Sequence, residues 1–198
     1  MNLLKANYEG KVGQTVGAKW KNLSTLRTFT KPSNPNPDAQ QTVRSGFKDI
    51  NAFVALFADQ IRYKSALNTA GMSVRNAIVK LNKEMVSKNT FNKANLVISK
   101  GGLQKVAGEA AAATAGKVTV TWTAPTATNF TEEAKLIAVL VQEESGMVEV
   151  VEADADALTA EGTLTFEAGT VDCYVYFLDK RGSNKIASLS DYISVTVA

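Results

Sequence analysis

From Lys117 to the end of the chain, short runs of β-forming residues alternate with clusters of turn-forming residues. The turn clusters include 124–129 and 180–184, which are rich in Pro, Thr, Asn, Gly and Ser. Antiparallel β-sandwiches have short strands separated by turns in this way. The pattern therefore predicts a small antiparallel sandwich over residues 117–198. The runs with strand composition are Val118–Thr123, Lys135–Gln142, Met147–Val151, Thr163–Glu167, Val171–Leu178 and Ile193–Val197.

The run 171–178 contains the single cysteine of the chain and two of its five tyrosines. Successive side chains of a strand point to opposite faces, so Tyr174 and Tyr176 are predicted on the face opposite Cys173. We expect the cysteine face to be buried and the tyrosine face to be exposed. Burial among apolar side chains raises the pKa of a thiol, which makes Cys173 a core residue rather than a nucleophile.

An amphipathic pattern precedes the sandwich and predicts a helical hairpin over residues 38–100. Asn36 is a favourable N-cap with Pro37 at the first helical position. A second helix is expected after Ser73 as its cap, and Asn95–Ser99 resembles a short buried strand. The apolar stripe of the first helix repeats at spacings of three and four residues and consists of Val43, Phe47, Ile50, Val54, Phe57 and Ile61.

Residues 8–31 are rich in Gly, Thr and Val, which favours short strands joined by tight turns. We expect strands near Val12–Val16, Ala18–Lys21 and Thr25–Thr30. Alternation then sets Lys19 and Lys21 opposite Trp20, and puts Arg27, Phe29 and Lys31 together on one face. A β-arm of this size holds no core of its own, so it must lie on the rest of the protein, a neighbouring subunit or a nucleic acid.

These patterns together predict an α+β protein with four segments. Residues 1–37 form a basic extended β-arm that ends in a Pro-rich connector, and residues 38–100 form the helical hairpin and short strand. Residues 101–116 are rich in Ala and Gly; they favour either helix or linker, and we place the domain boundary here. Residues 117–198 form the sandwich, which is predicted to be immunoglobulin-like.

The net charge of +3 conceals two halves of opposite sign. Residues 1–116 carry 17 Lys and Arg against 6 Asp and Glu, whereas residues 117–198 carry 5 against 13. An asymmetry of this size predicts that the basic half faces an anionic surface, such as nucleic acid or an acidic protein. The alternative is that the two halves neutralise each other across an internal interface.

Several classes of chemistry lack the residues they need. The chain has no His and one Cys, which excludes an internal disulfide, a His/Cys zinc site and a Ser–His or Cys–His pair. The glycines from Gly10 to Gly17 lack the Gly-Lys-Ser/Thr ending of a phosphate-binding loop. The acidic run 152–156 lacks the glycine and the distal Glu of a calcium loop. We expect no catalytic residue, no metal and no cofactor, and no stretch reaches the ~18 apolar residues of a membrane span.

One constellation remains as a candidate binding site, a set of basic residues interleaved with aromatic ones. The cations could neutralise phosphates while the rings stack on bases, but they also suit docking on an acidic protein surface. No helix-turn-helix, RNP-type or zinc motif accompanies them. The candidate residues are Lys11, Lys19, Trp20, Lys21, Arg27, Phe29, Lys31 and Arg44.

Two resemblances extend this interpretation. The segment Lys117-Val-Thr-Val-Thr-Trp-Thr-Ala-Pro125, with 174–178 and Ser194-Val-Thr-Val, resembles the B, F and G strands of a fibronectin type III or related immunoglobulin-like sandwich. The order Gly10-Lys-Val-Gly13, Gly17-Ala-Lys-Trp20, Arg27, Lys31-Pro-Ser-Asn-Pro35, Ala39-Gln-Gln41, Arg44, Phe47, Val120-Thr-Trp122 and a final Tyr-Val-Tyr-Phe resembles an uncharacterised family of Bacteroidota and their phages. The second resemblance implies a phage-borne structural protein and supplies no catalytic residues.

We therefore expect a non-enzymatic structural component of a bacteriophage virion, in the head, neck or tail, that docks through its basic N-terminal region. Its expected partners are other virion proteins, in a homo-oligomer or symmetric assembly that forms in the host cytoplasm, with neither a membrane nor a small-molecule substrate. The main alternative is a cytosolic nucleic-acid-binding accessory protein. A carbohydrate-binding module is a further alternative, disfavoured because few aromatic residues are expected on the surface of the sandwich.

Overall fold

The chain divides into two compact units between Pro37 and Asp38. This computed structural model describes residues 9–21, 23–31, 37–67, 71–181 and 184–198. The division falls where the predicted arm and connector end. Each unit is described below by itself.

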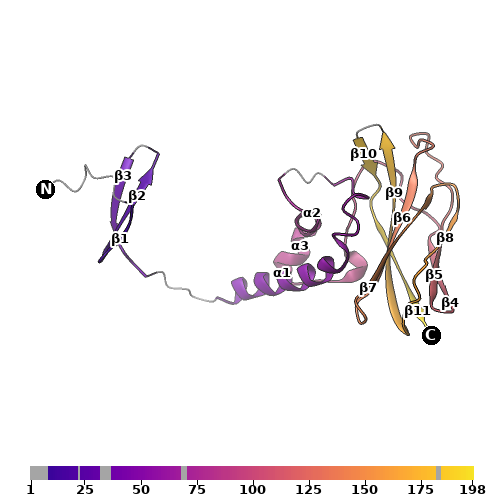
Figure 1. Cartoon of the computed structure of the whole chain (residues 1–198), viewed down its shortest axis with the longest axis horizontal. Coiled ribbons are helices and arrows are strands. Elements are labelled where there is room, and N and C mark those ends of the chain that lie inside the picture. The colour runs from indigo at the N-terminus through magenta and orange to yellow at the C-terminus, as the bar shows by residue number, and fades with distance from the viewer. Residues whose placement is uncertain (1–8, 22, 32–36, 68–70, 182–183) are drawn as a thin grey trace. The chain divides into compact units, whose positions relative to one another are not determined.

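The first unit is a three-stranded antiparallel sheet, shown in indigo in Figure 1. Its strands are β1 (Gly10–Val12), β2 (Thr15–Trp20) and β3 (Leu23–Thr28). The predicted strand Val12–Val16 is wrong, because a turn at Gly13 and Gln14 divides it. Gly13 has φ +60°, which glycine adopts without steric cost and which suits the two-residue turn of a hairpin.

The second unit begins with the predicted helical hairpin, which the structure confirms. The helix α1 (Asp38–Phe57) packs against α2 (Val74–Leu81) and α3 (Lys83–Lys88), and a 3₁₀ turn, η2 (Lys93–Asn95), follows. Ser73 caps α2 as expected, because its Oγ accepts a hydrogen bond from the backbone N–H of Asn76 at 3.2 Å. The helices approach closely at Gly46, where an added Cβ would lie 2.4 Å from the carbonyl oxygen of Val86.

Two antiparallel sheets follow the helices. One sheet has the order β4-β5-β8 and the other has β7-β6-β9, with β10 and β11 both paired to β9. The strands are β4 (Ala110–Thr114), β5 (Lys117–Thr121), β6 (Lys135–Gln142), β7 (Met147–Asp154), β8 (Thr159–Glu161), β9 (Gly169–Arg181), β10 (Asn184–Ala187) and β11 (Asp191–Val197).

This strand order is that of an immunoglobulin-like β-sandwich. Together with the helices that precede it, the sandwich confirms the predicted α+β class. The first, second and fifth strands form one sheet, and the third, fourth and later strands form the other. Because β10 and β11 pair with successive parts of β9, they act as one interrupted final strand. The segments that resemble strands B, F and G lie in β5, β9 and β11, the positions that the resemblance implies.

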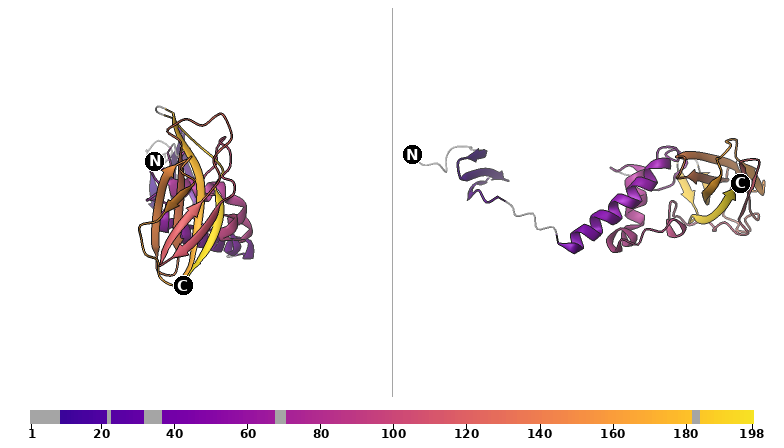
Figure 2. Two further views of the ribbon diagram at one scale, coloured as in Figure 1. Left: turned by 90° about the vertical axis from the view of Figure 1, so that its right-hand side faces the viewer. Right: turned by 90° about the horizontal axis from the view of Figure 1, so that it is seen from below.

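The five-stranded sheet is buried on both faces, which gives the second unit three layers (Figures 1 and 2). In β6, Ile137 and Val139 pack under the helices, whereas Leu136 and Leu140 pack against the three-stranded sheet. The long β9 follows the same alternation. The sheet is therefore the common wall of two hydrophobic cores.

The helical layer corrects the prediction that Tyr174 and Tyr176 are exposed. Both are buried, because the helices cover the face to which they point. Each phenolic hydroxyl is satisfied there: Tyr174 donates a hydrogen bond to the carbonyl of Lys93 at 2.9 Å, and Tyr176 donates to that of Lys64 at 2.8 Å. Cys173 is buried on the opposite face between the sheets, as predicted.

The predicted linker at residues 101–116 also differs from the structure. Part of it is β4, whose residues pair with β5 from Ala110 opposite Thr121 to Thr114 opposite Lys117. Alternate alanines, Ala111 and Ala113, pack against the core between the sheets. The segment is thus the first strand of the sandwich, and the helices and sandwich belong to one unit.

Two predicted strands form no strand in the structure, and side chains accept several of their backbone N–H groups. In Asn95–Ser99, the N–H of Val97 donates to the side chain of Asn82, and that of Ile98 donates to Ser190 Oγ. In Thr163–Glu167, the carboxylate of Glu149 accepts the first two backbone N–H groups. Since side chains satisfy these backbone donors, neither segment forms a strand.

Candidate functional site

The register of the arm brings two of the predicted cations onto one face of its sheet. Lys11 lies opposite Val16 in the β1–β2 pair, and Val16 lies opposite Arg27 in the β2–β3 pair. Directly opposed residues of an antiparallel sheet share a face. Lys11, Val16 and Arg27 therefore form a row across all three strands.

Phe29 lies beside this row and forms a cation–aromatic cluster with it. The ammonium of Lys11 lies 3.6 Å from the centroid of the Phe29 ring, within the range of a cation–π contact. The backbone N–H of Phe29 donates a hydrogen bond to the carbonyl of Gln14 at 2.6 Å, which continues the β2–β3 hairpin beyond its last strand residue. These residues surround a hollow of about 490 Å³ lined by Lys11, Val16, Arg27, Thr28, Phe29 and Thr30.

The other candidate residues lie elsewhere. Lys19 is paired with Ser24 and lies on the face opposite the row, because it is three residues from Val16. Lys21 is in the turn after β2, with φ +54°, and Lys31 follows the sheet as an exposed residue. Trp20 is the last backbone position of β2, and its side chain lies outside the described residues.

Arg44 belongs to the second unit, where it lies on an exposed turn of α1. The structure therefore groups Lys11, Arg27 and Phe29 and does not group the eight candidates as one site. Sequence reasoning missed Val16 and the two threonines of the hollow. Their signal was the glycine turn after Val12, which fixes the register of the hairpin and so aligns Lys11 with Val16.

The arm exposes apolar side chains as well as cations. Val12, Leu23, Leu26 and Phe29 are among the exposed large hydrophobic residues of the chain. Because a sheet of three short strands has two open faces, it buries too little apolar area to form a core by itself. These side chains suit a surface that a partner covers.

The cations of the arm and those of the second unit have different surroundings. In the second unit, Lys64 pairs with Glu152 at 3.4 Å and Lys105 with Asp191 at 2.5 Å. Among the described residues, no such ion pair involves Lys11 or Arg27. Residues 1–37 contain one acidic residue, Glu9, against six Lys and Arg. Internal neutralisation therefore accounts for part of the charge asymmetry in the second unit, and the arm keeps a strong positive charge.

Lys93 contacts two carboxylates of the second unit at once. Its ammonium lies 2.6 Å from Glu143 Oε2 and 3.0 Å from Asp172 Oδ2, and Tyr192 donates a hydrogen bond to Asp172 Oδ1 at 2.7 Å. Desolvation lowers the pKa of Lys93, but these two carboxylates raise it by more, so the net shift is upward. The charged ammonium therefore links η2 to the five-stranded sheet. No sequence pattern predicts this network.

The Cys173 thiol and the Tyr192 phenol are both shifted toward their neutral forms. Burial, with a smaller contribution from Asp172, raises the pKa of the Cys173 thiol to about 12. Burial is also the main cause that raises the pKa of Tyr192 to about 12. Such shifts oppose nucleophilic or base chemistry at neutral pH. Within the described residues, no group of three or more His, Cys, Asp or Glu could hold a metal ion, and no helix is long and apolar enough to cross a membrane.

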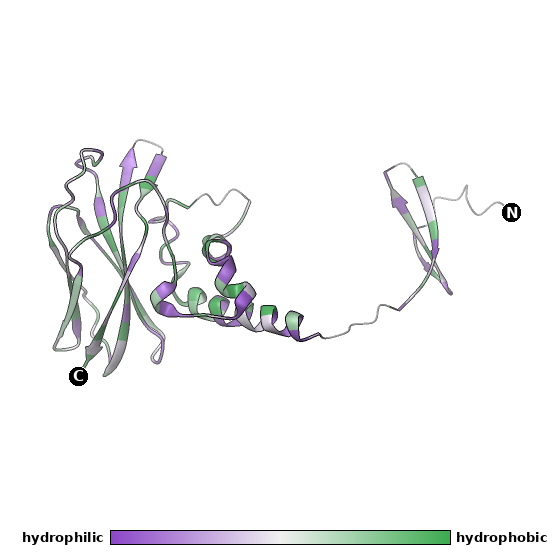
Figure 3. Cartoon of the chain, turned by 180° about the vertical axis from the view of Figure 1, so that it is seen from behind, coloured by the Kyte–Doolittle hydropathy of each residue, from purple (hydrophilic) through white to green (hydrophobic). Residues whose placement is uncertain are grey.

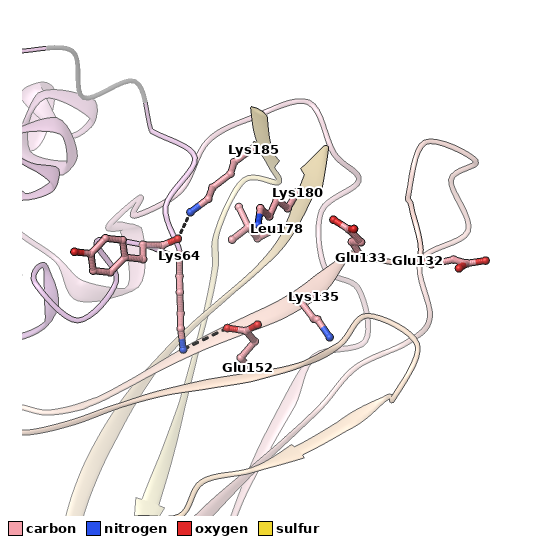
Figure 4. Close-up of a pocket in the computed structure, with 9 residues that line it drawn as sticks. Lys64, Glu132, Glu133, Lys135, Glu152, Leu178, Lys180 and Lys185 are labelled. Atoms are coloured by element: carbon pink, nitrogen blue, oxygen red, sulfur yellow. Dashed lines mark hydrogen bonds and ion pairs between the residues drawn. The ribbon is translucent and has the colours of Figure 1, made fainter. Parts of the chain in front are cut away.

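A second hollow, of about 510 Å³, lies in the second unit (Figure 4). Its charges are mixed: Lys64 pairs with Glu152, and Lys185 donates a hydrogen bond to the carbonyl of Tyr63. Lys135 pairs with Asp154 beside it. Because four lysines and three glutamates line the hollow, the opposite charges nearly cancel and it presents no strong field to a ligand.

Fold and site together define a class: an α+β protein with an immunoglobulin-like β-sandwich, a helical layer on it and a small basic β-arm. The chain belongs to the family of unknown function DUF6266, whose model matches residues 7–194. No curated protein matches the chain.

Among solved structures, the chain is similar to the extracellular region of rat CD45, domains d3–d4. The sequence identity is 17% and the TM-score is 0.38. The match covers 50% of this chain and 52% of that chain, so this chain spans about half the length of its structural neighbour.

Proposed function

We propose that this protein is a non-enzymatic docking protein whose basic arm binds an anionic surface of a larger assembly. The observation that carries the proposal is the face of the arm on which Lys11 and Arg27 flank Phe29 without a carboxylate partner among the described residues. The arm is a unit separate from residues 38–198, and it joins them through a Pro-rich segment.

The physical reason is that the arm by itself leaves apolar side chains exposed and its positive charge largely unbalanced. Its apolar residues, such as Val12 and Leu23, gain free energy when a partner removes them from water. Its cations gain most from a partner that supplies the missing negative charge. A partner that is both apolar and acidic satisfies both needs, which favours a protein surface over the uniform charge of nucleic acid.

The setting that we propose is a bacteriophage virion, in its head, neck or tail, with other copies of the chain and other virion proteins as neighbours. The support is the resemblance of the N-terminal motifs to a family of Bacteroidota and their phages, together with the architecture. A body built from two packed cores and a small docking arm suits a protein that acts by fixed geometry rather than by turnover.

A specific observation also supports the alternative, a nucleic-acid-binding accessory protein. Lys11 and Arg27 share a face with the ring of Phe29, and proteins that bind single-stranded nucleic acid combine cations with a stacking ring. In this alternative, the cations contact phosphates and Phe29 stacks on a base.

One pair of variants separates the two functions. The test variant Lys11→Ala/Arg27→Ala removes both cations from the arm face, and the matched control Lys88→Ala/Lys100→Ala removes two exposed lysines from the second unit. Docking on a protein predicts that the wild type and the control appear at a fixed ratio to the major structural proteins of purified particles. The test variant should be depleted from those particles.

Binding to random single-stranded DNA, measured at several salt concentrations, gives the other result. If the arm binds phosphates, the slope of log affinity against log salt should fall by about 1.4 in the test variant, about 0.7 for each phosphate that a cation no longer neutralises. If purified particles lack the chain and the test variant shows this smaller slope, the results support nucleic-acid binding and contradict docking on a protein. Equal behaviour of the test and control variants in both assays would contradict both functions.

A further inference from the structure

The apolar stripe of α1 extends beyond the core that it helps to build. Ile50, Val54 and Phe57 are buried against the sheet, but Val43 is 42% exposed and Phe47 is 50% exposed. Green residues recur along the whole of α1 in Figure 3. The first turns of the helix therefore present an apolar surface that the second unit itself leaves uncovered.

This surface is one wall of a groove of about 320 Å³ between α1 and the pair α2 and α3. Val79 and Val86 lie on its floor and are nearly buried. The charged residues that line it are Lys80 and Lys83, both exposed. An occupant of the groove should thus carry an apolar side chain beside negative charge.

The loop between β7 and β8 of the same protein has that chemistry. Leu158 is 44% exposed, and the acidic residues Asp154 and Asp156 precede it, of which Asp154 also pairs with Lys135. Leu158 has φ +64°, a left-handed backbone conformation that leucine rarely adopts. A strained, exposed leucine directly before β8, with acidic residues beside it, is suited to contact with a partner.

The loop is held in a fixed shape before any contact is made. The carbonyl of Leu158 accepts a hydrogen bond from the N–H of Trp122 at 3.1 Å, and Ala155 donates to the carbonyl of Ala134 at 3.0 Å. A loop that is already ordered loses little conformational entropy when it binds.

The groove and the loop of one chain are on opposite sides of the five-stranded sheet. Val79 and Val86 belong to the core under the helices, whereas Ala155 in the loop and Ala160 in β8 belong to the core between the sheets. The sheet therefore separates the loop from the groove of its own chain. The loop is available to the groove of a second copy.

We propose that copies of this chain associate head to tail, with Leu158 of one copy in the α1–α2–α3 groove of the next. Lys80 and Lys83 then face Asp156 and Asp154, so the contact weakens as salt rises. Because its two surfaces differ, the contact is heterologous and propagates into a ring or a filament. It does not involve the arm, and it is independent of the docking function proposed above.

The test uses two complementary variants of the full chain in sedimentation velocity over a concentration series. Phe47→Asp blocks the groove and keeps the loop, whereas Leu158→Asn removes the anchor, tolerates the positive φ and keeps the groove. Each variant alone should associate at least about tenfold more weakly than the wild type, which forms oligomers. An equimolar mixture should form a dimer and nothing larger, because one intact loop and one intact groove remain.

The controls are matched in chemistry. Leu189→Asn removes another exposed leucine and should associate like the wild type, as should Lys11→Ala/Arg27→Ala, which alters the arm. A wild type that stays monomeric throughout the series would overturn the inference. So would a mixture of the two variants that stays monomeric, or a loss of association in the arm variant.

Discussion

Phe57→Ala tests whether the helical layer and the sandwich unfold as one body. The Phe57 ring is fully buried, 5.7 Å from the Phe53 ring and 6.1 Å from the Tyr174 ring of β9. Truncation of such a side chain removes its transfer free energy and leaves a cavity, which together cost about 3–5 kcal/mol. For a domain of this size each 1 kcal/mol lowers Tm by about 2–4 °C, so we expect a fall of about 6–20 °C.

The assay follows two layers during the same thermal unfolding experiment. Far-ultraviolet circular dichroism reports on the helices. Fluorescence of Trp122 reports on the core between the sheets, where its indole N–H donates to the carbonyl of Ala155 at 2.8 Å. Trp20→Phe is present in every sample, so that Trp122 is the sole tryptophan of the chain.

If the second unit is cooperative, both signals should shift by the same amount in Phe57→Ala, although Trp122 lies on the other side of the five-stranded sheet. Tyr63→Ala removes an exposed aromatic residue from the same layer and should shift neither signal by more than about 1 °C. A lower helical transition with an unchanged Trp122 transition would refute the reasoning. It would restore the domain boundary that the sequence placed at residues 101–116.

Three further substitutions test individual contacts. Gly46→Ala should lower Tm by several degrees despite the higher helix propensity of Ala, since its Cβ would meet the Val86 carbonyl; an unchanged Tm would show that α1 and α3 separate freely. Burial raises the pKa of Asp179, but hydrogen bonds from Thr131 and Arg181 lower it by more. Its stabilisation is therefore present at neutral pH and lost as pH falls through the depressed pKa. Asp179→Asn should cost about 1–3 kcal/mol by urea unfolding at pH 7 and much less in acid, and an equal cost at both would contradict this sign. Burial and a hydrogen bond with Asp191 raise the pKa of Glu109, so the protonated form is favoured and its stabilisation is lost as pH rises. Glu109→Gln should accordingly raise Tm at neutral pH and flatten its pH profile, and a lower neutral Tm would contradict the assignment.

The sequence predicts the elements of this fold better than it predicts their arrangement. Ser73 as a cap and the strand 135–142 are local features, set by hydrogen-bonding chemistry and by alternation, and both predictions are confirmed. Tyr174 and Tyr176 are predicted exposed because alternation identifies a second face without showing what covers it. That cover comes from residues more than 100 positions away, such as Phe57 and Ile61, which no local pattern connects to β9.

The predicted linker fails for a related reason. An alanine run has no β-branched or aromatic signal, so its composition favours helix or linker. In the structure Ala111 and Ala113 are in a strand because small side chains fit beside the core between the sheets. Packing space, which local propensity does not measure, decides the conformation of this segment.

The basic arm shows what the net charge of a segment predicts about its binding residues and what it leaves open. The summed charge of residues 1–116 predicts an anionic partner for the whole basic half, but Lys64, Lys93 and Lys105 find carboxylates within their own unit. On the arm, Lys11 and Arg27 have no such ion pair among the described residues, and strand register rather than sequence spacing aligns them. A net charge therefore predicts a partner of opposite charge, and only the pairing of strands shows which basic side chains share one face. For this reason Lys11 and Arg27, and not the full set of eight residues, are the positions whose substitution tests the proposed function.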